Sequence, residues 1–316
     1  MITRREFVGA TAALGVLAFA TRVGAAGARP FFAAHGLPIG IQLYVLEPDL
    51  DRDFDGTLAA LSRIGYRSVE LAGFHGHSAA ELKAAFDKHG LICRSGHFQP
   101  VNRGTGPAFD DIDALARDCH TIGITDVVLP IPLFPQDFRP PAQTNAGDGF
   151  RLSGEAMTLD NWKRTAAFLN EKGRTLKAHG LRAGYHNHNF EFRPFGDTTG
   201  FAKLLDATDP ALVSFEMDAG WVVAGGHDPL AVLAKYRGRF TQMHVKDVKA
   251  TTTTNYSVRQ DPTEVGGGTI DYRAIFAHRQ QAGMRHFFVE HDNAAQTIGS
   301  LASIEASYAY LRRLLA

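Results

Sequence analysis

The sequence lacks a net charge and is nearly free of cysteine. Its 33 lysines and arginines balance its 33 aspartates and glutamates. A neutral chain offers no broad electrostatic surface to a nucleic acid duplex or an anionic membrane, so we expect no nucleic acid partner. With only two cysteines, Cys93 and Cys119, a disulfide framework and a cysteine-rich zinc module are excluded. Any bound metal must therefore be held by carboxylates and by some of the 14 histidines.

The N-terminal apolar stretch is too short to cross a membrane. It covers residues 8–20, about 13 residues, whereas a transmembrane helix needs about 20. Arg4 and Arg5 precede it, and small residues follow at 23–28. Residues 1–28 resemble a bacterial twin-arginine signal peptide; an uncleaved anchor or a chance basic start are the alternatives. We therefore predict cleavage within residues 25–28 and a periplasmic mature chain without stable membrane insertion.

Apolar material is abundant, because 45% of the 316 residues are hydrophobic and 21% are charged, which excludes a wholly disordered chain. From residue 38 onward, short β-branched runs alternate with helical patterns, as in βα units around a parallel sheet. Strands are predicted at residues 39–44, 68–71, 91–97, 126–130, 181–186, 212–218, 240–244 and 286–290. Helices are predicted at residues 58–64, 79–89, 112–122, 159–179, 201–207, 229–236, 272–282 and 304–314. This eightfold alternation predicts a single (β/α)8 TIM barrel over residues 36–316 rather than two domains.

Two connections of the predicted barrel are much longer than the others. They cover residues 131–158 and 249–270, and both follow strands, on the face where barrel active sites lie. We interpret them as lids. Glu264 stands beside the glycines at 266–268, so we expect it to close toward the site. A phosphate-binding loop is disfavoured there, because the segment lacks the Gly-Lys-Ser/Thr ending of a nucleotide loop.

Polar side chains interrupt or follow most of the predicted strands. A barrel brings the carboxyl ends of its strands onto one rim, so these residues are expected to lie close together. Any one of them alone is better interpreted as a hydrogen-bonded core residue. Together they offer imidazoles and carboxylates, which suit Mn, Fe, Co, Ni or Zn. The residues are Gln42, Glu70, His97, His186, His188, Glu216, Asp218, His244, Lys246, Asp247, Glu290, His291 and Asp292.

At these residues the chain after the signal segment resembles the xylose-isomerase-like barrel family, which contains sugar phosphate isomerases and epimerases and, more distantly, endonuclease IV. The segments that carry the resemblance are Gly-Ile-Gln-Leu-Tyr at 40–44, Val-Glu-Leu at 69–71, Ser-Gly-His at 95–97, Tyr-His-Asn-His-Asn-Phe-Glu-Phe at 185–192, Phe-Glu-Met-Asp at 215–218 followed by Trp221, Met-His-Val-Lys-Asp at 243–247, Glu-Val-Gly-Gly-Gly-Thr-Ile-Asp at 264–271 and Phe-Val-Glu-His-Asp at 288–292.

The resemblance implies one divalent metal, held by Glu, Asp, His and Glu from strands five to eight. The last three positions correspond to Asp218, His244 and Glu290. The first departs from the family pattern, because the usual Glu-Asn-His is here His186-Asn187-His188. The implied ligand set is therefore His186, Asp218, His244 and Glu290, with His188 as a competitor for the fourth position. The metal could be Mn, Co, Zn, Ni or Fe.

An imidazole in the first position disfavours epimerisation by two symmetric glutamates. The step that remains is removal of the proton α to a carbonyl, with the carbonyl polarised by the metal. The resulting enediolate can be reprotonated, which gives isomerisation, or can expel a β-substituent, which gives elimination. Members with His-Asn-His look similar to enzymes acting on keto-inositols or 3-keto-glycosides. The export signal favours an unphosphorylated sugar or glycoside as the small-molecule substrate.

Individual roles follow from the same resemblance. Glu290 is expected to serve as ligand and base, His188 as base or fourth ligand, and His97 in proton transfer or hydroxyl contact. Lys246 is expected either to stabilise an enediolate oxygen or to form a salt bridge with Asp247 or Glu216. The expected substrate-binding residues, of which Trp221 has core packing as its alternative, are Gln42, Glu70, Glu216, Trp221 and Glu264.

Three function classes remain open from the sequence. The first is a metal-dependent isomerase, epimerase or lyase of a keto-sugar. The second, a DNA-repair nuclease on the same fold, is disfavoured by the neutral charge and the export signal. The third is a periplasmic sugar-binding barrel without turnover.

Overall fold

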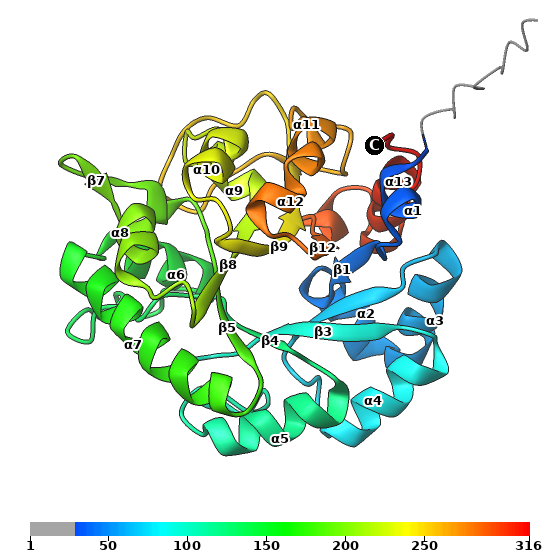
Figure 1. Cartoon of the computed structure of the whole chain (residues 1–316), viewed down its shortest axis with the longest axis horizontal. Helices are drawn as coiled ribbons and strands as arrows, with labels where there is room; N and C mark the ends of the chain where they lie inside the picture. Colours follow the sequence, from blue (N-terminus) through cyan, green and yellow to red (C-terminus); the bar gives the residue numbers. More distant parts are fainter. Residues whose placement is uncertain (1–28) are drawn as a thin grey trace, which may run out of the picture.

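The computed structural model describes residues 29–316, which form one closed barrel of parallel strands surrounded by helices (Figure 1). The predicted signal peptide, residues 1–28, lies outside the described residues. Around the barrel the strand order is β1-β12-β9-β8-β5-β4-β3-β2. The prediction of a single (β/α)8 barrel is confirmed. The barrel strands are β1 (Gly40–Gln42), β2 (Ser68–Ala72), β3 (Ile92–His97), β4 (Asp126–Leu129), β5 (Arg182–His186), β8 (Val213–Asp218), β9 (Phe240–Val245) and β12 (His286–Val289).

The outer helices follow the predicted order, with one difference. The pattern at residues 272–282 predicts one helix, but the structure has two, because His278 leaves helical geometry with ψ near 0°. Gly123 and Gly283 end α5 and α12 in the left-handed region, with φ of 100° and 95°. The helices are α3 (Phe54–Ile64), α4 (Ala79–Lys88), α5 (Ile112–Ile122), α7 (Leu159–Ala178), α8 (Gly200–Ala207), α10 (Pro229–Lys235), α11 (Tyr272–Ala277), α12 (Arg279–Ala282) and α13 (Ser300–Leu311).

Barrel packing begins before residue 36, the expected start of the domain. A short helix, α1 (Phe31–His35), lies against the closing strand. The ring of Phe31 stacks on Phe276 with 4.7 Å between centroids, and Phe32 packs edge-on against Phe287 at 5.8 Å. Aromatic pairs of this kind add to the stabilisation from burial. Residues 31–35 therefore belong to the folded unit.

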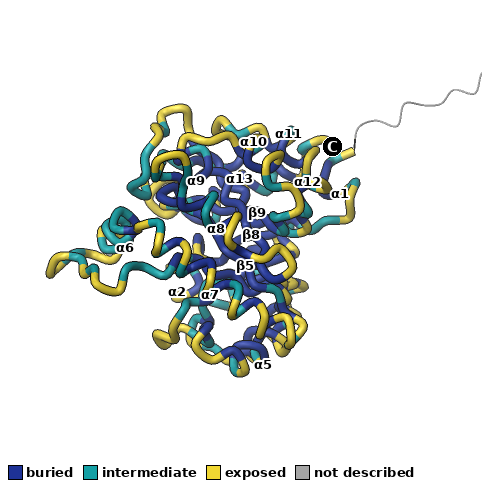
Figure 2. The backbone as a smooth tube through the Cα atoms, turned by 60° about the vertical axis from the view of Figure 1, so that its left-hand side comes forward, coloured by how far each residue is buried: buried dark blue, intermediate teal, exposed yellow. Residues whose placement is uncertain are grey.

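Smaller elements decorate the connections. The connection 131–158 holds α6 (Ala146–Glu155), which with its flanking loop projects from the barrel and is mostly half-buried or exposed (Figure 2). The connection 249–270 holds β11 (Pro262–Thr263), paired with β10 (Asp247–Val248). The remaining elements are α2 (Glu47–Arg52), α9 (Ala219–Ala224), the hairpin of β6 (Pro194–Phe195) and β7 (Thr198–Thr199), and short 3-10 turns at Leu43–Leu46, Phe190–Phe192 and Ala294–Gln296.

Strand interiors form the buried core, seen as the dark centre in Figure 2. Cys93 and Cys119 are both buried and free. Within residues 29–316, none of the helices has the length and apolar character needed to cross a membrane.

Candidate active site

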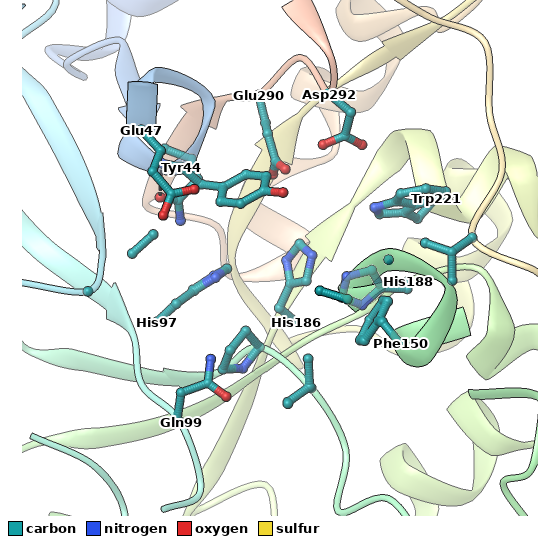
Figure 3. Close-up of a pocket in the computed structure, with 18 of the residues that line it drawn as sticks. Tyr44, Glu47, His97, Gln99, Phe150, His186, His188, Trp221, Glu290 and Asp292 are labelled. Carbon is teal, nitrogen blue, oxygen red and sulfur yellow. Dashed lines mark hydrogen bonds between the residues drawn. The ribbon is translucent and has the colours of Figure 1, made fainter. Parts of the chain in front are cut away.

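A cavity of about 1150 Å³ opens at the carboxyl ends of the barrel strands (Figure 3). This is the face on which barrel active sites lie. Six of the predicted site residues line it: Gln42, His97, His186, His188, Trp221 and Glu290. The predicted residues that do not line it are Glu70, Glu216, Asp218, His244, Lys246 and Glu264. All of these except Glu264 are fully buried at the strand ends.

Asp218, His244 and Glu290 form one compact group, which we call the triad. Their ligand-type atoms lie within 4.8 Å of one another. Strand register explains the meeting, because Asp218 of β8 pairs with His244 of β9, and Glu290 directly follows β12. Asp218 also caps α9, since its Oδ1 accepts the Trp221 N–H at 2.8 Å. The resemblance therefore places these three residues correctly with respect to one another.

The donor atoms of the triad fit a divalent metal. His244 Nδ1 and Glu290 Oε2 are buried without a hydrogen bond from the described chain, and buried Asp218 Oδ2 faces only the ammonium of Lys246. His244 Nδ1 and Glu290 Oε2 lie in contact, yet without hydrogen-bond geometry. Buried polar atoms are nearly always satisfied in folded proteins, so the two unpaired atoms beside a buried carboxylate suit a bound ligand. Two carboxylates and one imidazole suit a transition-metal ion.

The positive charge of Lys246 partly balances the negative charge of the two carboxylates of the triad. Its ammonium is fully buried, with Nζ 2.9 Å from Asp218 Oδ2, 3.1 Å from Glu290 Oε1 and 3.0 Å from Asp292 Oδ2. Burial lowers the pKa of Lys246, but the three carboxylates outweigh that effect and raise it well above its usual value. Of the two expected roles, the structure supports a salt bridge, although with other partners than Asp247 or Glu216.

His186 does not join the triad, which differs from the implied ligand set. Its Nδ1 lies 3.1 Å from Glu216 Oε2. The reason is register: His186 of β5 pairs with Glu216 of β8, which is two residues before Asp218. His186 Nδ1 thus faces Glu216 rather than Asp218. Burial, the largest effect, brings the pKa of the His186 imidazole well below its usual value.

A second group of ligand-type side chains surrounds Glu216 and shares His244 with the triad. The distances to Glu216 Oε2 are 2.8 Å from His97 Nε2, 3.1 Å from His186 Nδ1 and 3.1 Å from His244 Nε2. Glu216 was expected to bind substrate, but it is fully buried beneath the cavity. Its contacts are with imidazoles.

Glu70, another expected substrate-binding residue, also lies beneath the cavity. Its Oε2 is 2.6 Å from His244 Nε2 and accepts a 2.7 Å hydrogen bond from Gln42 Nε2. Its Oε1 accepts a 2.5 Å hydrogen bond from Ser95 Oγ, which in turn accepts one of 2.8 Å from Gln242 Nε2. Glu70 therefore fixes the His244 ring, as carboxylates do behind metal-binding imidazoles.

Sequence reasoning missed Ser95 and Gln242. A usable signal was present, because each stands two residues before a singled-out histidine on its strand, and such residues point to the same side.

Aromatic side chains form one wall of the cavity (Figure 3). The His188 ring lies 5.0 Å from Phe150 and 5.8 Å from Trp221, centroid to centroid. Trp221 and Phe98 are buried but line the cavity, and Tyr44, also at the cavity, is 55% exposed. Phe150 and Tyr44 were not predicted, since they belong to a long connection and a strand-following turn. A wall of this kind can cover the apolar face of a sugar ring.

The first part of the connection 249–270 reaches the cavity as a turn at residues 255–260. Asn189 Nδ2 donates to Asn255 Oδ1 at 2.8 Å, and Val258 N donates to Asn189 Oδ1 at 3.1 Å. Val258 lines the cavity with φ of 54°, a backbone strain rarely tolerated by a β-branched residue. Gln260 Nε2 contacts Asp292 Oδ2. This turn covers the cavity.

The second part of that connection is held away from the cavity by hydrogen bonds to Asp247. Asp247 Oδ2 accepts hydrogen bonds from the N–H groups of Gly266 and Gly268 at 2.9 and 3.1 Å, and its Oδ1 accepts one from Ile270 at 3.2 Å. Glu264 accepts a 3.0 Å hydrogen bond from Thr263 Oγ1. The expectation that Glu264 closes over the site from a lid does not match this arrangement.

A sequence model of the xylose isomerase-like TIM barrel family matches residues 58–314 of this chain. Among curated relatives, an inosose dehydratase of Clostridium beijerinckii is 26% identical over 253 residues, which cover 72% of this chain and 79% of the relative. An inosose dehydratase of Bacillus anthracis is 38% identical over 93 residues, which cover 29% of this chain and only 30% of the relative.

Solved structures share the architecture. A sugar phosphate isomerase/epimerase from Parabacteroides distasonis superposes with a TM-score of 0.68 at 24% identity, over 88% of this chain and 94% of that chain. The IOLI protein, solved with a binding zinc atom, superposes with a TM-score of 0.56 at 13% identity, over 87% of this chain and 98% of its own. At these identities the likeness establishes the fold.

Proposed function

This chain belongs to the xylose isomerase-like TIM barrel family, and from that membership we propose that it is a divalent-metal-dependent enzyme that removes the proton α to the carbonyl of a keto-sugar. One observation carries the proposal: the buried ligand-type atoms of Asp218, His244 and Glu290 converge beside a large cavity. Bound there, a divalent ion would polarise the substrate carbonyl.

The chain's own residues supply the remaining functions. His188 and Glu290 both line the cavity, so a substrate bound there meets two groups able to take or return a proton. Phe150 and Trp221 cover one side of the substrate, and the 255–260 turn excludes water from above. Glu290 lines the cavity and belongs to the triad.

Elimination is the finer outcome that we propose for the same first step. Removal of the α proton leaves an electron pair that forms a carbon–carbon double bond as the β carbon–oxygen bond breaks, and the departing oxygen takes a proton from an imidazole. Two observations support it: His186 stands where symmetric epimerisation needs a glutamate, and curated relatives are named inosose dehydratase. A keto-inositol or a 3-keto-glycoside would serve as substrate.

The test is hydrogen exchange at the α carbon. The full chain is incubated in deuterated water with a keto-inositol or a 3-keto-glycoside, and NMR and mass spectrometry follow deuterium uptake, water loss and bond cleavage. We expect chelator-sensitive exchange that Asp218→Asn abolishes and that Glu171→Gln, an exposed carboxylate on α7, leaves unchanged. Exchange that persists without metal contradicts the proposal, and sugar binding without exchange identifies a binding protein.

We also propose export of the chain to the periplasm by the twin-arginine route. Arg4 and Arg5, the apolar stretch 8–20 and the small residues 23–28 support it. Replacing both arginines with lysine should hold the uncleaved precursor in the cytoplasm, as measured by cell fractionation and intact mass. Periplasmic delivery of that variant would contradict this route.

A further inference from the structure

Three imidazole nitrogens lie close to one carboxylate oxygen of Glu216 beneath the cavity. Glu216 Oε2 is approached at 2.8 Å by His97 Nε2 and at 3.1 Å by both His186 Nδ1 and His244 Nε2. A carboxylate oxygen has only two lone pairs to accept hydrogen bonds. Meanwhile Glu216 Oε1 is buried with no partner within the described residues. Hydrogen bonding within the described chain therefore leaves one oxygen of this buried carboxylate without a partner.

Both ring nitrogens of His244 already have a role. Its Nε2 lies closest to Glu70 Oε2, at 2.6 Å, so the ring donates its proton there. That choice of tautomer leaves the Nδ1 lone pair for the triad. His97 and His186 thus remain as the two imidazoles at Glu216 Oε2, and His97 Nε2 also lies 3.4 Å from Glu70 Oε2.

His97, His186 and Glu216 come from β3, β5 and β8, which lie within one run of four neighbouring strands of the barrel. His186 is 3% exposed and Glu216 is fully buried, while the His97 side chain is 12% exposed. Both imidazoles line the cavity and Glu216 lies below them. Two imidazoles and one carboxylate with the remaining positions open to a cavity form a ligand set that divalent metals use in catalysis.

We propose that His97, His186 and Glu216 bind a second divalent metal ion, distinct from the ion at the triad. A cation between the two imidazoles and the carboxylate would satisfy Nε2, Nδ1 and Glu216 together. Glu70 adds a second negative charge next to His97. At the same cavity, such an ion would bind a substrate oxygen adjacent to the one bound at the triad. That role rests on the proposed function, whereas binding of the metal does not.

The experiment counts metal ions per chain. The purified full chain is stripped with chelator, loaded with Co²⁺ or Zn²⁺, desalted and analysed by elemental mass spectrometry, with calorimetric titration in parallel. We expect two ions in the wild type, one in Glu216→Gln and in His97→Gln, and one in Asp218→Asn. With Co²⁺, the visible spectra of Glu216→Gln and Asp218→Asn should differ, because each retains a different site. Glu171→Gln is the control and should hold two ions.

His97→Gln keeps the test valid if Glu216→Gln does not fold, because the His97 side chain is partly exposed. A single ion in the wild type, lost in Asp218→Asn and retained in Glu216→Gln and His97→Gln, overturns the second site and leaves the proposed function standing. Two ions without any α-proton exchange would support the second site while contradicting the proposed function.

Discussion

The two nitrogens of His244 face very different surroundings. On the Nε2 side, both oxygens of Glu70 accept hydrogen bonds, which continue through Gln42 and Ser95. On the Nδ1 side, Asp218 Oδ2 faces the Lys246 ammonium, while Glu290 Oε2 and His244 Nδ1 itself are buried without a hydrogen bond from the described chain. Because folded proteins rarely leave buried polar atoms unpaired, the difference separates a side that holds the ring from a side that awaits a ligand.

The largest effect should come from the Nδ1 side. Asp218→Asn and Glu290→Gln each remove a charged donor of the triad, and we expect α-proton exchange to fall by more than about 10³-fold, since loss of a single electrostatic stabiliser already costs about 10²–10³. Bound metal should fall by one ion per chain. Exchange rates within tenfold of the wild type would show that this side is not the catalytic one.

Lys246→Met examines the counter-charge on the same side. The substitution leaves Asp218, Glu290 and Asp292 buried without their common cation. Removing one partner of a buried ion pair costs about 3–5 kcal/mol, so urea unfolding of the metal-free protein should show a loss of that size. Saturating metal should recover part of it by binding the folded state. The exposed Lys163→Met on α7 is the control, with a change below about 0.5 kcal/mol.

Glu70→Gln examines the Nε2 side. The amide can still contact Nε2 but no longer fixes the imidazole tautomer through a charge. We expect about 10–100-fold weaker metal binding at the triad, which is typical for loss of a carboxylate behind a metal-binding histidine. Competition with a coloured chelator measures it. A loss as complete as that of Asp218→Asn would erase the distinction between the two sides of His244.

The smallest effect is expected from Val258→Gly. Val258 lies in the 255–260 turn, away from both sides of the His244 ring. Val258→Ala is its matched partner, because both remove the side chain from the cavity roof but only glycine relieves the backbone at φ of 54°. We expect the glycine variant to be more stable than the alanine variant by about 1 kcal/mol in urea unfolding. Metal content should equal that of the wild type in both. Equal stability would mean that the turn carries no strain.

The strands were predictable from local sequence, and the reason is chemical. Several barrel strands, such as β4 (Asp126–Leu129), are short runs with β-branched residues, and the expected range 240–244 differs from β9 (Phe240–Val245) by one residue. Helix ends marked by glycine, such as Gly123, were equally readable. The break at His278 carries no sequence signal of this kind, and neither does α6 within the connection 131–158.

The candidate site was only partly predictable. Side chains two residues apart on a strand point the same way, which correctly turns Glu216 and Asp218 into the barrel. The alternation of side chains along a strand does not determine how deep a residue lies in the barrel, however. That depth is set by the register between neighbouring strands. The register shifts between Phe215 and Glu216, and between Val69 and Glu70. Glu216 and Glu70 lie beneath the cavity, where both contact imidazoles.

By itself the sequence determined the barrel, the rim on which its polar residues gather, and the kinship that brings Asp218, His244 and Glu290 together. Those features depend on local pattern and on residue identity. Only the tertiary structure decided that His186 stands opposite Glu216 rather than Asp218, that Lys246 is buried among three carboxylates, and that Asp247 fastens the glycine loop. These follow from strand register and packing, which couple residues far apart in the chain.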